Sequence, residues 1–155
     1  PYGTEALGVM RIEKGHAAGN ELTGQTSAAN LGMGRMVSKK KDCIGNTLSE
    51  RPDLNRDDGL RLVGFKPVNR VETLTSGAHF IALGKSAVMD NDEGWMSSVT
   101  FSPELGHSIG IGFIKQGSER LGEVVRAVDL VRGKDIEVEI VSAHFIDPEG
   151  ERLRV

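Results

Sequence analysis

The chain has 155 residues, of which 38% are hydrophobic and 26% are charged, and its net charge is −3. This composition is typical of a globular protein and excludes a disordered tail. Acidic and basic residues are interspersed without a basic stripe, so we expect no nucleic-acid partner. Cys43 is the only cysteine and no apolar run approaches the roughly 20 residues of a membrane span, so we expect a cytoplasmic protein with no membrane association.

The first third of the chain predicts short elements joined by loops. A helix is expected with Thr4 as its N-cap, with nearly continuous apolar positions up to Ile12 and a stop at Gly15. Because apolar residues occupy most of its circumference, we expect this helix to be buried on most sides. Residues 16–25 are typical of a loop, and Gly32 and Gly34 favour extended chain after it. A second short helix is expected over 47–51, before Pro52.

From residue 59 onward, strand-like segments recur between turn-forming residues. The predicted strands are 60–66, 79–83, 95–101, 108–115, 123–131 and 135–142. Alternation is clear in the last of them, where Ile136, Val138 and Ile140 share one face and Glu137 and Glu139 the other. The density of glycine between these segments favours a strongly curved sheet or a small antiparallel barrel.

The polar run over 52–59 is predicted to be a linker between two parts of unequal size. The expected fold class is therefore α+β and mainly β: a barrel-like antiparallel C-terminal domain over residues 56–155, preceded by a short α/β part over residues 1–55. Pro1 rather than Met begins the sequence, which favours a start inside a longer polypeptide.

Most familiar catalytic patterns are missing from the sequence. The four histidines are too far apart for a metal-ligand spacing, so no metal is expected. Cys43 has no neighbouring base and is interpreted as a small buried residue. A dinucleotide site needs a glycine motif that follows a strand and opens a helix, with a third glycine in place. Neither Gly32-x-Gly34 nor Gly110-x-Gly112 meets this requirement, so no dinucleotide site is predicted.

Two charged residues remain as site candidates. Glu13 ends an almost wholly apolar helix, so it is either exposed at the helix end or partly buried for binding. A buried carboxylate can accept two parallel hydrogen bonds from an amino-pyrimidine ring such as that of a pterin. Arg61 opens a predicted strand and is either a plain edge charge or a ligand for a carboxylate or a pterin oxygen.

Several motifs, in order along the chain, resemble the aminomethyltransferases of the glycine-cleavage T-protein family. In the first part they are RIEKG at 11–15, GNEL at 19–22, Thr26, LGMG at 31–34 and DCIG at 42–45. In the second part they are RLVGF at 61–65, Gly94, SSVTFSPEL at 97–105, SIGIG at 108–112 and HF at 144–145. The resemblance implies that residues 1–55 end a folate-binding domain and that residues 56–155 form the family's C-terminal barrel. It further implies tetrahydrofolate as cofactor, with Glu13 as the pterin-binding glutamate and Arg61 lining the folate cavity.

Within this family, two segments, PYGTEAL at 1–7 and FIDPEGERL at 145–153, are most similar to the alpha subunits of heterotetrameric sarcosine oxidases. That similarity implies an oxidoreductase that demethylates sarcosine at a flavin in another subunit. Glycine, hydrogen peroxide and 5,10-methylenetetrahydrofolate would be its products. The implied partners are the beta, gamma and delta subunits, and flavin and NAD would bind only in other parts of the complex.

The sequence also departs from the family pattern. Ala18-Gly19 stands where many members carry Tyr-Gly, so the aromatic wall of the folate site is expected to be missing or supplied elsewhere. The family's catalytic aspartate and the flavin modules match nothing in these 155 residues, so we expect no catalytic residue here and no activity of this region alone. Two alternatives remain: an aminomethyltransferase of the glycine-cleavage system, and a non-catalytic barrel used for subunit docking.

Overall fold

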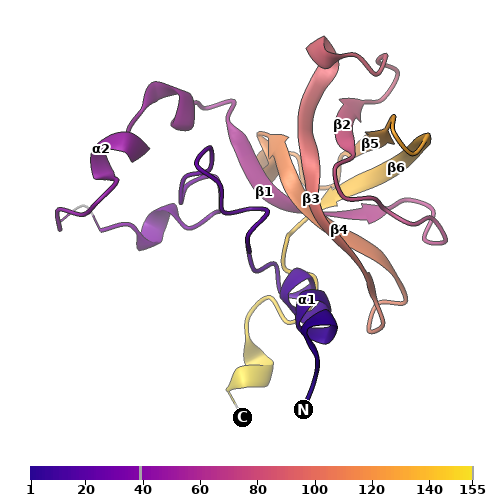
Figure 1. Cartoon of the computed structure of the whole chain (residues 1–155), viewed down its shortest axis with the longest axis horizontal. Coiled ribbons are helices and arrows are strands. Elements are labelled where there is room, and N and C mark those ends of the chain that lie inside the picture. The colour runs from indigo at the N-terminus through magenta and orange to yellow at the C-terminus, as the bar shows by residue number, and fades with distance from the viewer. Residues whose placement is uncertain (39, 155) are drawn as a thin grey trace.

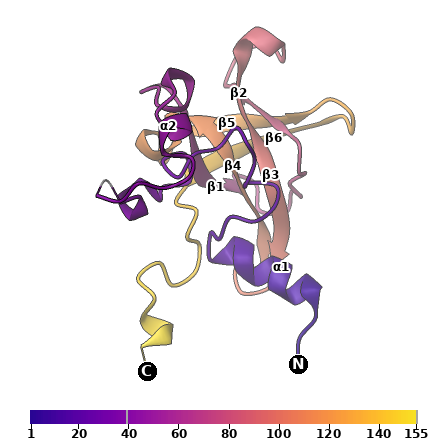
Figure 2. The same cartoon turned by 60° about the vertical axis from the view of Figure 1, so that its left-hand side comes forward.

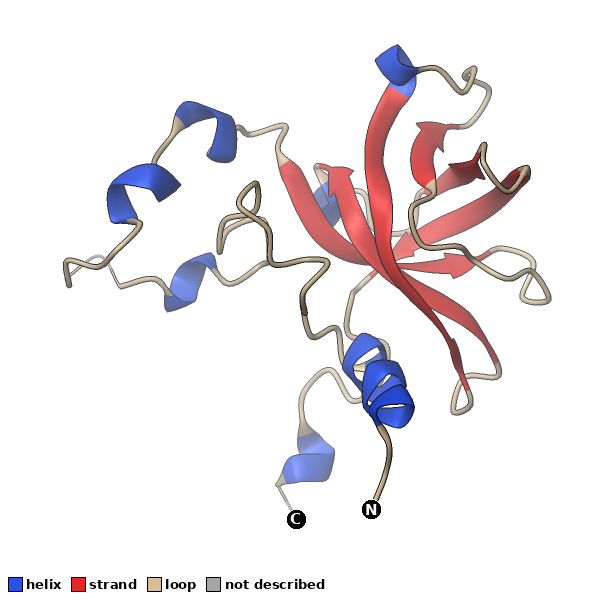
Figure 3. Ribbon diagram, viewed as in Figure 1, coloured by secondary structure: helices blue, strands red, loops and turns tan. Residues whose placement is uncertain are grey.

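The computed structural model describes residues 1–38 and 40–154. Figure 3 shows the mainly β character of the chain, with helices confined to short segments. The elements in chain order are α1 (Thr4–Glu13), η1 (Gly34–Met36), α2 (Asn46–Ser49), η2 (Pro52–Leu54), β1 (Leu60–Pro67), β2 (His79–Ala82), η3 (Met89–Asn91), β3 (Asp92–Ser102), β4 (His107–Lys115), η4 (Gly117–Glu119), β5 (Val124–Asp129), β6 (Lys134–Val141) and η5 (Glu151–Leu153).

The strands form a closed antiparallel barrel in the order β1-β4-β3-β2-β5-β6 (Figure 1). Closure pairs both edges of every strand, which leaves no open edge for aggregation. All the strands predicted from the sequence are present, and the predicted fold class is confirmed. β3 begins at Asp92, three residues before the predicted 95, because Gly94 lies inside the strand and does not end it. Only glycine fits there: its φ is +151°, and a Cβ would overlap Phe113 O.

The interior of the barrel is apolar and tightly packed. Phe65 of β1 and Phe80 of β2 are fully buried and stack with ring centroids 4.0 Å apart. β6 follows its predicted alternation, with Ile136, Val138 and Ile140 buried in the same cluster. Burial of this kind contributes about 25 cal/mol per Å² of apolar surface, so this core is the main source of the barrel's stability.

A second, smaller apolar cluster lies beneath α1. Ile12 of the helix packs with Ile109 and Ile111 of β4, so α1 covers one outer face of the barrel (Figure 2). Gly110, between the two isoleucines, faces the main core, where an added Cβ would lie 2.5 Å from the Met96 sulfur. The alternation of isoleucine and glycine in β4 therefore reflects packing on both sides of the strand.

The N-terminal helix differs from its prediction in two ways. Its N-cap is Gly3 rather than Thr4, and no side chain caps it. Ile12 is its only buried residue, whereas Leu7 and Met10 are 51% and 43% exposed. The prediction of burial on most sides is thus wrong, because the barrel covers only one stripe of the helix. The predicted stop at Gly15 is confirmed: Glu13 is the last helical residue, and the φ of Gly15, +71°, and its close approach to Ala143 O exclude a side chain there.

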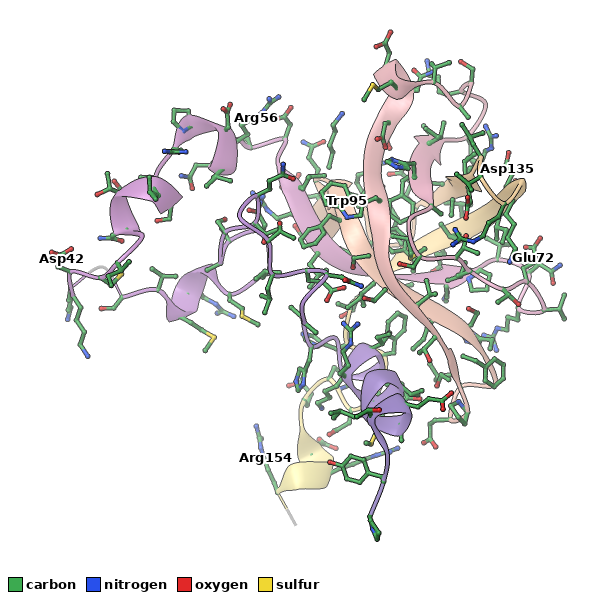
Figure 4. The ribbon with its side chains drawn as sticks, viewed as in Figure 1. Asp42, Arg56, Glu72, Trp95, Asp135 and Arg154 are labelled. Atoms are coloured by element: carbon green, nitrogen blue, oxygen red, sulfur yellow. The ribbon has the colours of Figure 1, made fainter. Side chains whose placement is uncertain are left out.

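The segment between α1 and β1 stands to one side of the barrel (Figure 1). Gly34–Met36 forms a 3-10 turn instead of the predicted extended chain, because the backbone closes locally with Met36 N donating to Met33 O. Cys43 is exposed, which contradicts its predicted burial, since this segment extends away from the barrel and its neighbour Asp42 lies at the tip (Figure 4). Within the described ranges, no helix combines the length and apolar character needed to cross a membrane.

Candidate functional site

Glu13 lies where α1 meets two other parts of the molecule. Its backbone carbonyl accepts hydrogen bonds from the N–H groups of Phe145 and Ile146, at 3.0 and 3.1 Å. Its carboxylate Oε1 accepts a hydrogen bond from Ser102 Oγ at 2.5 Å. The last carbonyls of a helix need partners from outside the helix, and here the tail after β6 supplies them. The end of α1 is therefore fixed to the β3–β4 hairpin and to the C-terminal tail together.

Two open cavities adjoin Glu13. The larger, about 570 Å³, is lined by Tyr2, Leu7, Met10, Arg11, Glu13, Lys14, His16, Ile146, Asp147 and Arg152. The smaller, about 300 Å³, is lined by Ala6, Val9, Met10, Glu13, Pro103 and Glu104. Both combine an apolar helix flank with charged groups at the rim. Such a lining suits a ligand with apolar faces and a few polar groups.

The electrostatics of the larger cavity are partly neutralised within the protein. Lys14 Nζ forms an ion pair with Asp147 Oδ2 at 3.2 Å. Burial acts to raise the pKa of Asp147, but the Lys14 ammonium and backbone donors outweigh it and hold that pKa below its usual range. Arg152 reaches Glu104 at 3.3 Å in an exposed pair. Glu13 Oε2, by contrast, accepts no hydrogen bond from the described residues.

Arg61 lies apart from Glu13. It is the second residue of β1, opposite Ile114 of β4, and its Nη1 donates to the neighbouring carbonyl of Leu60 at 3.0 Å. Neither cavity beside Glu13 is lined by Arg61. Among the described residues, Glu13 thus lies between two cavities, and Arg61 lies on the barrel wall and lines neither of them.

A buried ionic cluster beside α1 was not predicted. Glu21 is completely buried, and its Oε2 accepts hydrogen bonds from Arg11 Nη1 at 2.9 Å and from the N–H of Ala18 at 2.8 Å. Its Oε1 accepts hydrogen bonds from Ser97 Oγ at 2.5 Å and Ser98 Oγ at 2.7 Å. Arg11 Nη2 also donates to Ser98 Oγ at 2.8 Å, which closes a ring of charge-assisted bonds.

A β-bulge makes this cluster possible. The register of β3 against β4 shifts between Met96 and Ser98, so Ser97 is an extra residue in β3. Consecutive side chains of a regular strand point to opposite faces, whereas a bulge re-aims one of them. Both serine hydroxyls consequently reach the same oxygen of Glu21.

The carboxylate of Glu21 is held in its charged form. Burial acts to raise its pKa, but the hydrogen bonds from Ser97, Ser98 and Ala18, together with the charge of Arg11, outweigh this effect and lower the pKa below its usual range. With four donors on its two oxygens, Glu21 has little capacity left for a ligand. Its role is therefore to attach the loop after α1 to the barrel. No period or spacing in the loop could have predicted this burial.

A further cavity and an aromatic pair lie away from Glu13 and Glu21. A mainly apolar cavity of about 440 Å³ lies between the β2–β3 connection and the β5–β6 turn, with the pair of His79 Nδ1 and Asp92 Oδ2, 2.8 Å apart, in its lining. On β3, Trp95 packs against Phe113 with ring centroids 5.5 Å apart (Figure 4). In the part of the chain that the structure describes, no three His, Cys, Asp or Glu side chains are grouped to hold a metal ion.

Comparison with known proteins identifies the barrel. Residues 61–147 match the family described as the glycine cleavage T-protein C-terminal barrel domain. An aminomethyltransferase T of the glycine cleavage system from Bartonella henselae superposes on 94% of this chain and 39% of its own, with a TM-score of 0.72 and 23% identity. That likeness confirms the fold.

Sequence relatives extend the similarity over the whole chain. Sarcosine oxidase subunit alpha from Rhizobium meliloti (strain 1021) is 38% identical across 100% of this chain and 16% of its own length. The corresponding subunit from Corynebacterium sp. (strain P-1) is 37% identical across 98% of this chain and 16% of its own. An aminomethyltransferase from Rubrobacter xylanophilus is 30% identical across 97% of this chain and 39% of its own. The chain thus spans about one-sixth of the sarcosine oxidase subunits that it matches.

Proposed function

Because the chain belongs to the family of the glycine cleavage T-protein C-terminal barrel domain, we propose that it serves as the folate-binding C-terminal region of a sarcosine oxidase alpha subunit. The observation that carries this choice is the difference in similarity: 36% to 38% identity to sarcosine oxidase alpha subunits, against 27% to 30% for the aminomethyltransferases. Both groups align along nearly the entire chain, so the difference is not due to coverage.

In this proposal, the chemistry is divided between parts of an assembly. Sarcosine is oxidised at a flavin bound by a partner subunit, and the one-carbon unit passes to tetrahydrofolate near this region. Residues 1–55 contribute the end of the folate-binding domain, and residues 56–155 form the barrel on which it rests. The other subunits are partners by the same reasoning, since the flavin and the catalytic aspartate match nothing in these 155 residues.

The geometry of Glu13 supports folate as the ligand. A pterin offers a ring N–H and an amino N–H side by side, which pair with the two oxygens of one carboxylate. Oε1 of Glu13 accepts one bond, from Ser102, and Oε2 accepts none from the described residues. A carboxylate oxygen accepts about two hydrogen bonds, so both oxygens keep capacity for such an edge. We place the pterin edge at Glu13, beside one of its two cavities.

Arg61 has a secondary role in this proposal. Its guanidinium makes one hydrogen bond, to the adjacent carbonyl of Leu60, and so keeps most of its donors available. Since it lines neither cavity beside Glu13, it would contact a distal part of an extended ligand, away from the pterin ring. Arg61→Ala is accordingly expected to weaken folate binding less than a change at Glu13.

Glu13→Gln tests the proposal in the assembled enzyme that contains this region. Glutamine keeps the shape but replaces one charged acceptor, so tetrahydrofolate binding is expected to weaken by about 1.5–3 kcal/mol, or roughly 10- to 150-fold. Isothermal titration with tetrahydrofolate measures this change. Glu139→Gln is the matched control, because it removes the same charge from a surface pair with Lys66 that lines neither cavity beside Glu13, and it should leave affinity within about twofold. Tetrahydrofolate binding that is unchanged in Glu13→Gln would overturn the proposal.

Two further measurements separate the alternatives. The oxidase assignment predicts flavin absorbance in the purified assembly and flavin reduction by sarcosine, both unaffected by Glu13→Gln. An aminomethyltransferase would lack this absorbance and transfer an aminomethyl group from a lipoyl carrier instead. A docking barrel would assemble with partners but show no folate binding in any variant.

A further inference from the structure

We infer that Ser102 is the positioning residue of Glu13: its hydroxyl fixes the carboxylate so that the remaining acceptor positions are presented to the amino-pyrimidine edge of a ligand. The inference rests on the proposed folate-binding function and adds a residue to it. Ser102 itself contacts no ligand in this account. It acts through Glu13 alone.

Ser102 is well suited to hold a carboxylate. It is the last residue of β3, and its side chain is fully buried at the β3–β4 turn. Its Oγ accepts a hydrogen bond from the N–H of Leu105 at 3.1 Å and donates to Glu13 Oε1 at 2.5 Å. Because the Leu105 N–H occupies an acceptor position of the hydroxyl, the hydroxyl proton is directed to the carboxylate. The distance lies in the range of strong O–H···O⁻ bonds.

The hydrogen bond from Ser102 limits the freedom of the Glu13 side chain. Its backbone is fixed by the bonds that its carbonyl accepts from Phe145 and Ile146, but its side chain still has three rotatable bonds. Freezing a side chain of this kind costs conformational entropy. A hydrogen bond formed before the ligand arrives moves that cost from the binding step to folding, which raises affinity.

Glu21 and Glu13 differ in how many hydrogen bonds their carboxylates accept within the protein. Glu21 is completely buried and accepts hydrogen bonds from four donors, so both of its oxygens are committed. Glu13 has one donor, on Oε1, and no buried side-chain oxygen in the described residues lacks a partner, so its unpartnered Oε2 is reached by solvent. Ser102 thus orients Glu13 without saturating it.

The test compares tetrahydrofolate affinity in the assembled enzyme carrying Ser102→Ala and Ser108→Ala. Ser108 is the matched control: it is a buried serine of the same hairpin that accepts the Leu74 N–H at 3.2 Å, and its hydroxyl donates to Thr100 O rather than to Glu13. Loss of one hydrogen bond is typically worth a factor of about 2 to 13 in affinity. Ser102→Ala should therefore weaken binding about three- to tenfold, and Ser108→Ala by less than twofold.

A double-mutant comparison isolates the positioning role. In a Glu13→Ala background, Ser102→Ala should produce no further loss of affinity, because the group that Ser102 positions is gone. A general loosening of the hairpin would weaken binding in both backgrounds. Flavin reduction by sarcosine should be equal in all variants. If Ser102→Ala does not yield folded enzyme, Ser102→Cys, which keeps nearly the same volume with a weak donor, is measured in its place with the same expected direction.

The outcomes separate this inference from the function on which it rests. If the unmodified enzyme does not bind tetrahydrofolate, or if Glu13→Gln binds it normally, the proposed function fails. If Glu13→Gln weakens binding but Ser102→Ala and Ser102→Cys do not, the function stands and the inference is overturned. Equal losses in Ser102→Ala and Ser108→Ala, or an undiminished loss in the Glu13→Ala background, also overturn the inference.

Discussion

The barrel and the segment that precedes it are stabilised in different ways. The barrel, from β1 to β6, buries a continuous apolar core that includes Phe65 and Phe80. In residues 1–38 and 40–59, the buried residues are Ile12, Gly15, Glu21 and Asn30. Half of these are polar. The barrel is thus stabilised mainly by apolar burial that many residues share, whereas the preceding segment depends on a few polar attachments, each of which is specific.

This difference has consequences for how each region responds to change. Apolar packing is non-directional, so the loss from one substitution depends on the cavity that it leaves. A buried polar group needs each of its partners, and removing one leaves the others unsatisfied. We therefore expect core substitutions to reduce the stability of the whole barrel, and substitutions at the polar attachments to release the N-terminal segment locally.

The largest effect is expected from Phe65→Ala. This fully buried ring stacks on Phe80, and its removal should lower the free energy of unfolding by about 3–5 kcal/mol. Urea unfolding followed by Trp95 fluorescence measures the change. Ile44→Ala is the control in the other region: Ile44 is fully exposed, so its truncation should shift stability by less than about 0.5 kcal/mol. Similar losses in both variants would show that the two regions are not distinct in this respect.

A smaller and more local effect is expected from Glu21→Gln. The amide cannot satisfy Arg11 and both serines at once, so the attachment of the N-terminal segment should weaken by about 2–4 kcal/mol. Hydrogen exchange should speed up over residues 11–30 while the barrel strands keep their protection.

Glu139→Gln is the control for this substitution, because Glu139 forms a half-exposed pair with Lys66 at 3.1 Å. A change of less than about 1 kcal/mol is expected there. If Glu21→Gln instead lowers protection equally in the barrel and in residues 11–30, the two regions unfold as one unit and the comparison fails.

Asn30→Ala should have a milder effect of the same kind. Asn30 joins the segment to the start of β1. Its side-chain amide donates to Leu60 O at 2.8 Å, and its backbone carbonyl accepts a hydrogen bond from the Leu62 N–H at 2.8 Å. Only the side-chain bonds are lost on substitution, so we expect about 1–2 kcal/mol. Hydrogen exchange of residues 26–32 reports the loss. Protection of β1 should change little, because β4 and β6 also hold that strand.

The smallest effect concerns pH. The pKa of Glu21 is lower in the folded state, so its charge stabilises the attachment above the ordinary glutamate pKa, and this contribution is lost as pH falls below about 4. The difference in residue 11–30 protection between the unmodified chain and Glu21→Gln should therefore shrink at low pH. Asp129, whose pKa Arg132 lowers to about 2, also titrates at low pH, but it is present in both proteins, so its contribution cancels in the difference. A difference that is constant down to pH 3 would contradict this account.

Local sequence patterns predicted the barrel well. Strand alternation and the turn-forming residues between strands are properties of neighbours in the chain, and every predicted strand is present. The pattern of β6, with Ile136, Val138 and Ile140 inward, is the clearest case. Local patterns were less informative before β1: the burial of α1 depends on contacts with β4, and the glycines at 32 and 34 do not distinguish extended chain from the observed turn at Gly34–Met36.

The candidate site was predicted only in part. Glu13 was singled out by its place on an apolar helix, whereas Ser102 and Glu21 carried no such signal. Ser102 lies 89 positions from Glu13, and Glu21 lies 76 and 77 positions from its two serines. The placement of Arg61 beside the same ligand stays a prediction.

What the sequence determined by itself is the set of strands, the curvature that glycines allow and the end of α1 at Gly15, because these depend on backbone freedom and on the period of apolar residues. Tertiary structure alone decided which side of α1 is covered, which carboxylate is saturated and which keeps acceptor capacity. The covered side of α1 follows from the packing of Ile12 on β4. The state of the two carboxylates follows from the bulge at Ser97 and the turn at Ser102, where the barrel brings hydroxyl groups to carboxylates far away in the chain. Hydrogen bonds act over about 3 Å in space and leave no periodic trace in the sequence.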